Sequence, residues 1–428
     1  MPRPWPEGPA DLLVKARLSP PDRARAAWRA WRAERDFDDA LQAEFRLLPG
    51  LAPRLDLLEP GADIRPRIEG IRRFNWARNR MRLARMLPFF DVLAAAGVTP
   101  MVLKAAARFA TSPEALKDRY CRDLDVLIRP EDLARATEAV LAAGWRPMTG
   151  NLPGRRRAVP FDRYLHGEPP GTGGGPEIDI HAWASHFDDR PGGDALLWSR
   201  ARPATLEGRK VMVPAPADDL LLGLLHGAVA DPHSPLDWAV DAAAAMGAPG
   251  MDWDTFLEEV RTRRFATAAG WGLGYLAEGV GLEVPAHVTA GLASAAHPLE
   301  ACELSATMQL KSGWSLLDRL AAVHMRRLRR RPTPVVRHVP PRTRLRDRMP
   351  LRLGRTERGG AAIELTFERG PEDLRVRQYD VLRDGRWLAR LRITPGWLDR
   401  ALGRRRWRFP FAGPREGIEI RPVEAEPR

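Results

Sequence analysis

The sequence predicts an α/β (α+β) protein in which helical regions flank a small mixed sheet and a β-rich module follows. Three observations support this prediction. Apolar residues recur at helical spacing before residue 97 and again between residues 217 and 296. Between these two regions stand short apolar runs of the length expected for strands. After residue 360, several segments alternate apolar and polar residues, which is typical of strands.

The N-terminal part of the chain is predicted to be helical. Residues 20–48 carry apolar residues at helical spacing and predict one or two helices, followed by Pro- and Gly-rich turns at 48–61. A second amphipathic helix is predicted over 71–96. It should end at Gly97, because glycine commonly stands just beyond a helix end. Residues 98–105 then predict a short strand.

Three further strands are predicted in the middle of the chain, at residues 122–128, 177–183 and 208–214. A helix is expected from Pro130 to Ala143, because proline suits the first helical turn and Gly144 follows as a stop. The pattern from Ala217 to about Ala296 is helical throughout. These elements together form the sheet and the helical region that the fold class requires.

Composition predicts where the chain divides. An Arg- and Pro-rich stretch begins at His324 and predicts a linker, and Asp384-Gly385 predicts a hairpin turn in the module after it. The expected regions are an N-terminal helical region (1–70), a sheet-containing core (71–215), a helical domain (216–323), the linker (324–359) and a small β-rich module (360–428).

Composition also excludes several classes of protein. The chain has 428 residues and is 44% hydrophobic, yet no run approaches the ~18 apolar residues of a membrane-spanning helix. We therefore expect no membrane partner. The only cysteines, Cys121 and Cys302, exclude a disulfide framework or a cysteine-based zinc site and fit a reducing cytoplasm.

The net charge of +13 could attract nucleotides or nucleic acid. However, the positive charge is carried almost wholly by arginine. With the abundant alanine, glycine and proline, this usage is typical of a GC-rich bacterial genome. The charge is therefore weak evidence about partners.

Paired acids carry the main chemical signal. Asp123 and Asp125 stand two apart on one predicted strand, so their carboxylates project from the same face. Asp179 lies on another strand, with His181 on its same face. Carboxylates that point together repel one another unless a cation lies between them, and Mg²⁺ takes carboxylates plus substrate phosphates. Two neighbouring strands could thus hold two metal ions for phosphoryl-transfer chemistry.

A bare Asp-x-Asp is more often a solvent-exposed strand end, but the surrounding residues favour the metal interpretation. The decisive runs are VLKAAARFA, RYCRDLDVLIRPEDLARATEAVLAAGWRP, EIDIHAW, VPAPADDLLLGLLHGAV and LDWAVDAAAAM. In this order they resemble a bacterial group of uncharacterised nucleotidyltransferases within the DNA polymerase beta superfamily. The resemblance covers about residues 70–290 and implies a polymerase-beta-type nucleotidyltransferase core.

The resemblance also implies roles for individual residues. The three catalytic, metal-binding acids match Asp123, Asp125 and Asp179. Lys104 matches a lysine at the end of the first strand, where related enzymes hold phosphates with a Gly-Ser pair. Arg119 matches the arginine that precedes Asp-x-Asp by four residues, and His181 matches the histidine after the third acid. These last three are the expected nucleotide-binding residues.

Several of these positions have a second interpretation. The family's usual Lys-Gly is Lys104-Ala105 here, which removes the closest backbone approach to a phosphate and the easy access to positive φ. Lys104 could still contact phosphates as a point charge, or it could be a chance lysine. Arg119 could be a phosphate clamp or a surface charge. His226 and Asp241 match recurring family positions. His226 lies in an apolar helix, which favours a hydrogen-bonded structural histidine over a metal ligand, and Asp241 could orient neighbouring helices or contact substrate.

The resulting hypothesis is a metal-dependent nucleotidyltransferase. It would move a nucleoside monophosphate from an NTP, with ATP as the default and Mg²⁺ or Mn²⁺ as cofactor, to an unidentified hydroxyl. The acceptor could be a small molecule, a peptide or protein, or RNA, and the C-terminal module could help to recognise it. The alternative is a catalytically degenerate module that binds a protein or RNA. A phosphohydrolase would need more His and Asp ligands than these residues supply.

Overall fold

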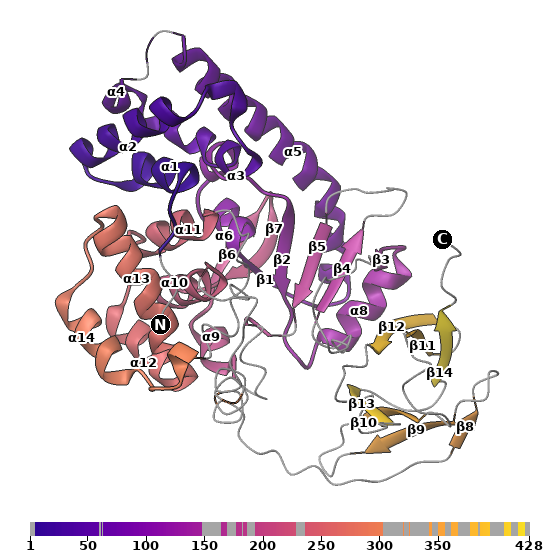
Figure 1. Ribbon diagram of the computed structural model, residues 1–428. Coiled ribbons are helices and arrows are strands. Elements are labelled where there is room, and N and C mark those ends of the chain that lie inside the picture. Colours follow the sequence, from indigo (N-terminus) through magenta and orange to yellow (C-terminus); the bar gives the residue numbers. More distant parts are fainter. Residues whose placement is uncertain are drawn as a thin grey trace. The chain divides into compact units, whose positions relative to one another are not determined.

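The computed structural model describes most of the chain up to residue 302 and the strands beyond it (Figure 1). The described residues are 5–147 without 60 and 62, then 164–168, 177–181, 183–185, 193–227, 236–302, 320, 325 and the strands β8 to β14 defined below. The arginine tract at 326–341, which the sequence predicts as part of a linker, lies outside these residues.

Contacts divide the chain into two compact units. Unit 1 consists of residues 1–87, 101–125 and 183–331, and unit 2 of residues 88–100, 126–182 and 332–428. The division falls within one strand, β2 (Asp123–Leu127), directly after Asp125. Each unit therefore contains part of β2.

The N-terminal helices of unit 1 are α1 (Pro9–Leu18), α2 (Pro21–Glu34), α3 (Gln42–Phe45) and α4 (Leu55–Leu58), with 3₁₀ turns at Phe37–Asp39 and Leu48–Arg54. The sequence predicts α2 well, because its buried residues Ala24, Ala27, Trp28 and Trp31 follow helical spacing. The turns predicted at 48–61 form the second 3₁₀ segment and α4 instead, so this stretch is more helical than its prolines suggest.

The later helices of unit 1 are α9 (Ala195–Arg200), α10 (Pro216–Leu225), α11 (Asp237–Met246), α12 (Trp253–Arg263), α13 (Ala266–Gly274), a π-helix at Tyr275–Val280 and α14 (Ala286–Ala295). They share one hydrophobic core with the N-terminal helices, in which Trp31 and Phe256 are both fully buried. The hydroxyl of Tyr275 donates to Asp11 Oδ1 at 2.7 Å across this core. The first and the third predicted regions are therefore packed together.

Two glycines end helices as the sequence predicts. Helix α5 (Arg65–Ala95) is followed by Gly97 at φ +69°, and Val98 N donates to Leu93 O at 2.9 Å. Helix α8 (Leu133–Ala142) is followed by Gly144 at φ +86°. Both helix ends need the left-handed conformation that glycine adopts without strain. Helix α8 begins after Pro130, because Asp132 N bonds to Arg129 O and closes a turn there first.

The sheet is mixed, and each unit holds one half of it. In unit 1 the order is β2, β1 (Met101–Leu103), β7 (Arg209–Val213) and β6 (Arg202–Leu206), with β1 and β7 parallel and β6 and β7 antiparallel. In unit 2 the order is β3 (Arg146–Pro147), β4 (Tyr164–Glu168), β5 (Glu177–His181) and β2. Strands β3, β4 and β6 were not predicted. The mixed α/β fold is confirmed.

The C-terminal strands form two antiparallel groups in unit 2. One has the order β13 (Arg406–Phe411), β10 (Ala361–Thr366), β9 (Pro350–Arg355) and β8 (Arg342–Arg344). The other has the order β12 (Arg386–Ile393), β11 (Arg377–Arg383) and β14 (Ile418–Val423). Strands β8 and β9 fall within 324–359, where the sequence predicts a linker. Strands β11 and β12 pair on either side of Asp384-Gly385, residues that lie outside the described part.

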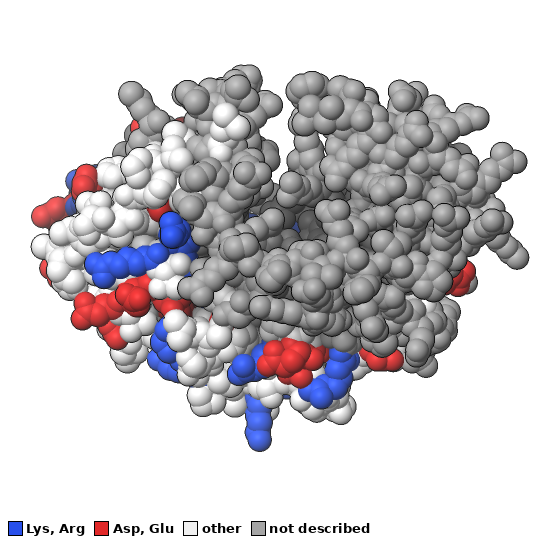
Figure 2. Space-filling model, turned by 90° about the horizontal axis from the view of Figure 1, so that it is seen from below, with Lys and Arg blue, Asp and Glu red and all other residues white. Residues whose placement is uncertain are grey.

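Among the described residues, no helix combines the length and the apolar character needed to cross a bilayer. Figure 2 shows acidic and basic side chains interspersed over the described part of one face. The positive net charge is thus mixed with acids wherever this face is described.

Candidate metal and nucleotide site

Strand β2 presents an acid on an otherwise apolar strand. Leu124, Val126 and Leu127 are fully buried, which fixes the strand in the sheet, and Asp125 is only 4% exposed. Asp123 begins the strand and is half-buried. Because side chains alternate along a strand, the two acids lie on the same face.

A candidate metal-binding group includes this buried acid. Asp125, Asp179 and His181 each offer one ligand atom, and these atoms lie within 4.8 Å of one another. Strand β5 supplies the last two from alternate positions, so both project from one face. Its neighbour in the sheet is β2, beyond which Ile128 N donates to His181 O at 2.9 Å. The structure therefore brings together two of the three predicted acids and the predicted histidine.

The donor atoms of this group fit a divalent cation. Two buried carboxylates close together repel each other unless a positive charge compensates them. Carboxylate oxygens suit Mg²⁺ and Mn²⁺, whereas an imidazole nitrogen suits transition metals better than Mg²⁺. The mixed set of Asp125, Asp179 and His181 is therefore chemically compatible with a divalent cation.

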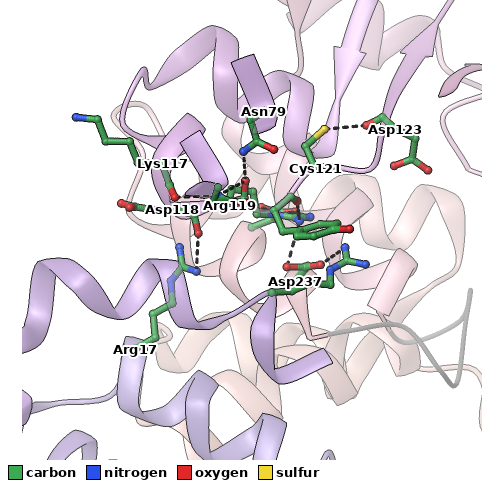
Figure 3. A network of polar contacts seen from close by, with 12 residues as sticks. Arg17, Asn79, Lys117, Asp118, Arg119, Cys121, Asp123 and Asp237 are labelled. Atoms are coloured by element: carbon green, nitrogen blue, oxygen red, sulfur yellow. Dashed lines mark hydrogen bonds and ion pairs between the residues drawn. The ribbon is translucent and has the colours of Figure 1, made fainter. Parts of the chain in front are cut away.

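Asp123 lies outside this group of three. Its backbone oxygen accepts a hydrogen bond from the Cys121 thiol at 3.0 Å, as Figure 3 shows. Burial, reinforced by the negative charge of Asp123, raises the pKa of Cys121 to about 12, so this thiol stays protonated. Cys121 is therefore a structural neighbour of Asp123.

Lys104 contacts the candidate metal-binding group directly. Its Nζ lies 2.6 Å from Asp125 Oδ1. Lys104 is the first residue of α6 (Lys104–Thr111), directly after β1, and has φ +51°, a left-handed conformation that is rare for a residue with a side chain. Ala105 lies inside the helix and is buried. The positive φ thus falls on Lys104 and not on the position where the family usually has glycine.

Arg119 is buried and paired with two acids of α11. Its Nε lies 3.0 Å from Asp241 Oδ1, its Nη2 lies 2.8 Å from Asp241 Oδ2, and its Nη1 lies 3.1 Å from Asp237 Oδ1. Burial alone would lower the pKa of Arg119, but the two carboxylates outweigh it and raise that pKa. Arg119 is therefore not a surface charge, and its guanidinium already has partners within the protein.

The family of the chain follows from comparison with known proteins. Residues 39–281, more than half of the chain, match the model of a family described as "Uncharacterised nucleotidyltransferase". The chain belongs to this nucleotidyltransferase family. The family predicted from the sequence is confirmed, and all of the predicted site residues lie inside the matched region.

The other comparisons add little to this assignment. Among solved structures, the solution structure of the antibiotic-resistance factor ANT(2'')-Ia matches with 14% identity over 46% of this chain and 95% of that chain. Its TM-score of 0.30 is too low to inform the fold. No curated protein matches the chain.

The segment that leads into β2 is held from several sides, as Figure 3 shows. From α5, Asn79 Nδ2 donates to the backbone oxygens of Leu116 and Arg119, both at 2.8 Å. From α1, Arg17 Nη1 donates to Asp118 O at 3.1 Å. Burial lowers the pKa of Arg17 to about 10, and the guanidinium remains charged at neutral pH.

These supporting residues were not identified from the sequence. One usable signal was present, because Asn75 and Asn79 stand four residues apart on a predicted amphipathic helix. Polar side chains on one face of a helix indicate a buried polar partner when that face packs on another element. The partners themselves, the backbone oxygens of residues 116–119, could not be identified without the fold.

Two further titratable groups, Asp219 of α10 and His226 directly after that helix, are affected by the charges of these residues. The positive charge of Lys104, together with burial, lowers the pKa of His226 to about 3, so His226 is neutral at physiological pH. Burial, together with the charge of Asp241, raises the pKa of Asp219 to about 7. Lys104 is thus the main cause of the shift at His226, and burial is the main cause at Asp219.

Proposed function

We propose that the chain is a metal-dependent nucleotidyltransferase that moves a nucleoside monophosphate from an NTP to an acceptor hydroxyl. The observation that carries this proposal is the convergence of Asp125, Asp179 and His181 within the region that matches the family. In the reaction, the acceptor oxygen bonds to the α-phosphorus while the bond from that phosphorus to the bridging oxygen breaks. Pyrophosphate leaves, and the hydroxyl proton is released.

The proposed roles follow from position. Asp125, Asp179 and His181 would hold a divalent ion, Mg²⁺ or Mn²⁺, and Asp123 on the same strand face would help to hold a second. Such ions neutralise charge on the transferring phosphate and on the departing pyrophosphate. The protein's own contribution is to fix these donors on adjacent strands, where their geometry is set by the sheet.

The start of α6 would receive the phosphates. Its N-cap residue, Leu103, makes no capping hydrogen bond through its side chain, and the first turn of a helix is a common place for an anion to bind. Lys104 adds a positive charge at the same point. Together they would take the place of the Gly-Ser pair that related enzymes use.

Arg119 takes a different role in this proposal. Its bonds to Asp237 and Asp241 fix the segment that enters β2, and with it the position of Asp123 and Asp125. We therefore assign Arg119 as a positioning residue and not as a phosphate clamp. ATP is the first nucleotide to test. The acceptor is a small molecule, a peptide or protein, or RNA, and the C-terminal strands are proposed to help recognise it.

The proposed function is tested by measuring the transfer of label from an NTP to an acceptor. The full chain is incubated with each α-labelled NTP, with Mg²⁺ or Mn²⁺ and with cell lysate, and the labelled product is identified. Asp179→Asn, which keeps the side-chain size but removes the charge, should reduce labelling at least ~100-fold. If neither nucleotide nor metal binds at millimolar concentration, the chain is instead a degenerate module that binds a protein or RNA.

A further inference from the structure

We propose that Lys104 is an exchangeable internal cation. It holds the Asp125 carboxylate in the absence of substrate and moves to the phosphates when a nucleotide arrives. Metal and nucleotide would then bind cooperatively, each favouring the state in which Lys104 has left Asp125. This inference rests on the proposed function, because it concerns the same nucleotide and metal site.

Lys104 and a metal ion would compete for the same carboxylate, that of Asp125. Lys104 Nζ lies 2.6 Å from Asp125 Oδ1, and Asp125 is also a member of the group with Asp179 and His181. A metal ion bound to Asp125 would come close to the ammonium of Lys104. Two cations beside one carboxylate repel each other, and the burial of Asp125 limits how far water screens them. Metal binding therefore favours movement of Lys104 away from Asp125.

The two side chains differ in how free they are to move. The side chain of Asp125 is 5% exposed, whereas that of Lys104 is 31% exposed. Lysine has a long, flexible stem and a compact charge, so the ammonium can change partners without a change in the backbone. Asp125 would stay in place, and Lys104 would exchange.

The backbone places Lys104 for this contact. It adopts φ +51° between the end of β1 and the rest of α6, although a side chain makes this conformation unfavourable. Such strain persists only where the surrounding structure enforces it, and it is concentrated at functional sites. The junction therefore keeps the root of the Lys104 side chain beside Asp125.

His226, which the charge of Lys104 affects, does not take part in this exchange. The charge of Lys104, followed by burial, keeps His226 neutral by lowering its pKa to about 3. While Lys104 is in place, the neutral imidazole brings no second positive charge to Asp125. The triphosphate, with several negative charges, is then a stronger partner for Lys104 than one carboxylate that a metal ion has begun to neutralise.

The exchange predicts opposite effects of one substitution. Lys104→Met removes the ammonium and keeps much of the stem. It should strengthen Mn²⁺ binding in the absence of nucleotide by ~10-fold, as measured by the loss of the free Mn²⁺ resonance signal. The same variant should weaken binding of metal-free ATP, measured in EDTA, by ~10-fold. A purely structural role would weaken both, since it would disturb the site.

Two controls accompany this test. Lys117→Met removes another lysine, one that pairs with Glu114 on the surface, and should change neither affinity. Lys104→Gly, which suits the positive φ, replaces Lys104→Met if the latter unfolds, and thermal unfolding is followed for both.

The outcomes separate the two proposals. If the wild-type chain binds neither Mn²⁺ nor ATP, the proposed function itself fails. If the wild-type chain binds both but removal of Lys104 leaves Mn²⁺ affinity unchanged or lower, the exchange is wrong while the proposed function stands. Tighter Mn²⁺ binding together with weaker ATP binding supports the exchange.

Discussion

Two basic side chains contact acids around β2, and they do so in different ways. Arg119 is buried, and its guanidinium contacts Asp237 and Asp241 of α11 through three nitrogens. Lys104 is partly exposed, and its Nζ contacts the Asp125 carboxylate. Arginine is always charged and has fixed geometry, whereas lysine is a mobile point charge.

The two contacts have different roles: the Arg119 contacts support the fold, and the Lys104 contact belongs to the candidate site. The acids that Arg119 holds lie outside the candidate metal group, so this pair can stay closed at every stage of a reaction. The acid that Lys104 holds is a candidate ligand, so this pair must open for a metal ion to bind. We expect the Arg119 cluster to determine stability and the Lys104 pair to determine ligand binding.

The largest expected effect is on stability at Arg119. Arg119→Met leaves Asp241 buried without its main cation, and loss of one partner from a buried pair costs about 3 to 5 kcal/mol. Chemical denaturation measures this change. The control is Arg135→Met, because Arg135 is exposed and its pair with Asp132 is a surface pair. A loss of less than about 1 kcal/mol for Arg119→Met would show that the cluster does not hold the segment.

A smaller effect is expected at Asp219, whose pKa depends on the same cluster. Burial and the charge of Asp241 raise the pKa of Asp219 to about 7, well above the ~4 of an unfolded chain. Between these values the folded state holds a proton that the unfolded state has released. The contribution to stability is thus fully present below about pH 4 and is lost as the pH rises through about 7.

Asp219→Asn should therefore change how stability depends on pH. The variant should be more stable than the wild type by about 1 to 2 kcal/mol at about pH 8, and similar to it near pH 4. Denaturation at both pH values measures this difference. Equal stability of the two proteins at high pH would mean that Asp219 is better solvated than its position suggests.

The smallest expected effect is on stability and concerns only the backbone conformation of Lys104. Lys104→Gly and Lys104→Ala both remove the ammonium, but only glycine relaxes at φ +51°. The glycine variant should be the more stable of the two by about 1 kcal/mol, as measured by thermal unfolding. If alanine is as stable as glycine, the left-handed conformation is not enforced by the fold.

Local patterns allowed much of the fold to be predicted. Asp123 and Asp125 stand on a strand with apolar neighbours, and Gly97 and Gly144 end helices at the predicted positions. These features depend only on residues close in sequence. The family followed from the order of several such runs, and its match over 39–281 confirms it.

Features that depend on distant residues could not be predicted. Arg119 and Asp241 are 122 positions apart, so only the fold reveals that they form a pair. Strand β4 stands beside β5 but follows a stretch rich in Arg, Pro and Gly, which gives little strand signal. The positive φ at Lys104 was expected, if anywhere, at position 105. The backbone conformation of Lys104 depends on the geometry of the junction between β1 and α6. The spacing of residues in the sequence does not reveal this geometry.

The most direct test of the account is spectroscopic. Mn²⁺ is bound to the full chain in the presence of a nucleotide analogue, and electron spin echo modulation reports whether an imidazole nitrogen coordinates the ion. We predict nitrogen modulation in the wild type and in His226→Asn, and its loss in His181→Asn. Modulation that survives in His181→Asn, or Mn²⁺ that does not bind at all, would contradict a metal site built from Asp125, Asp179 and His181.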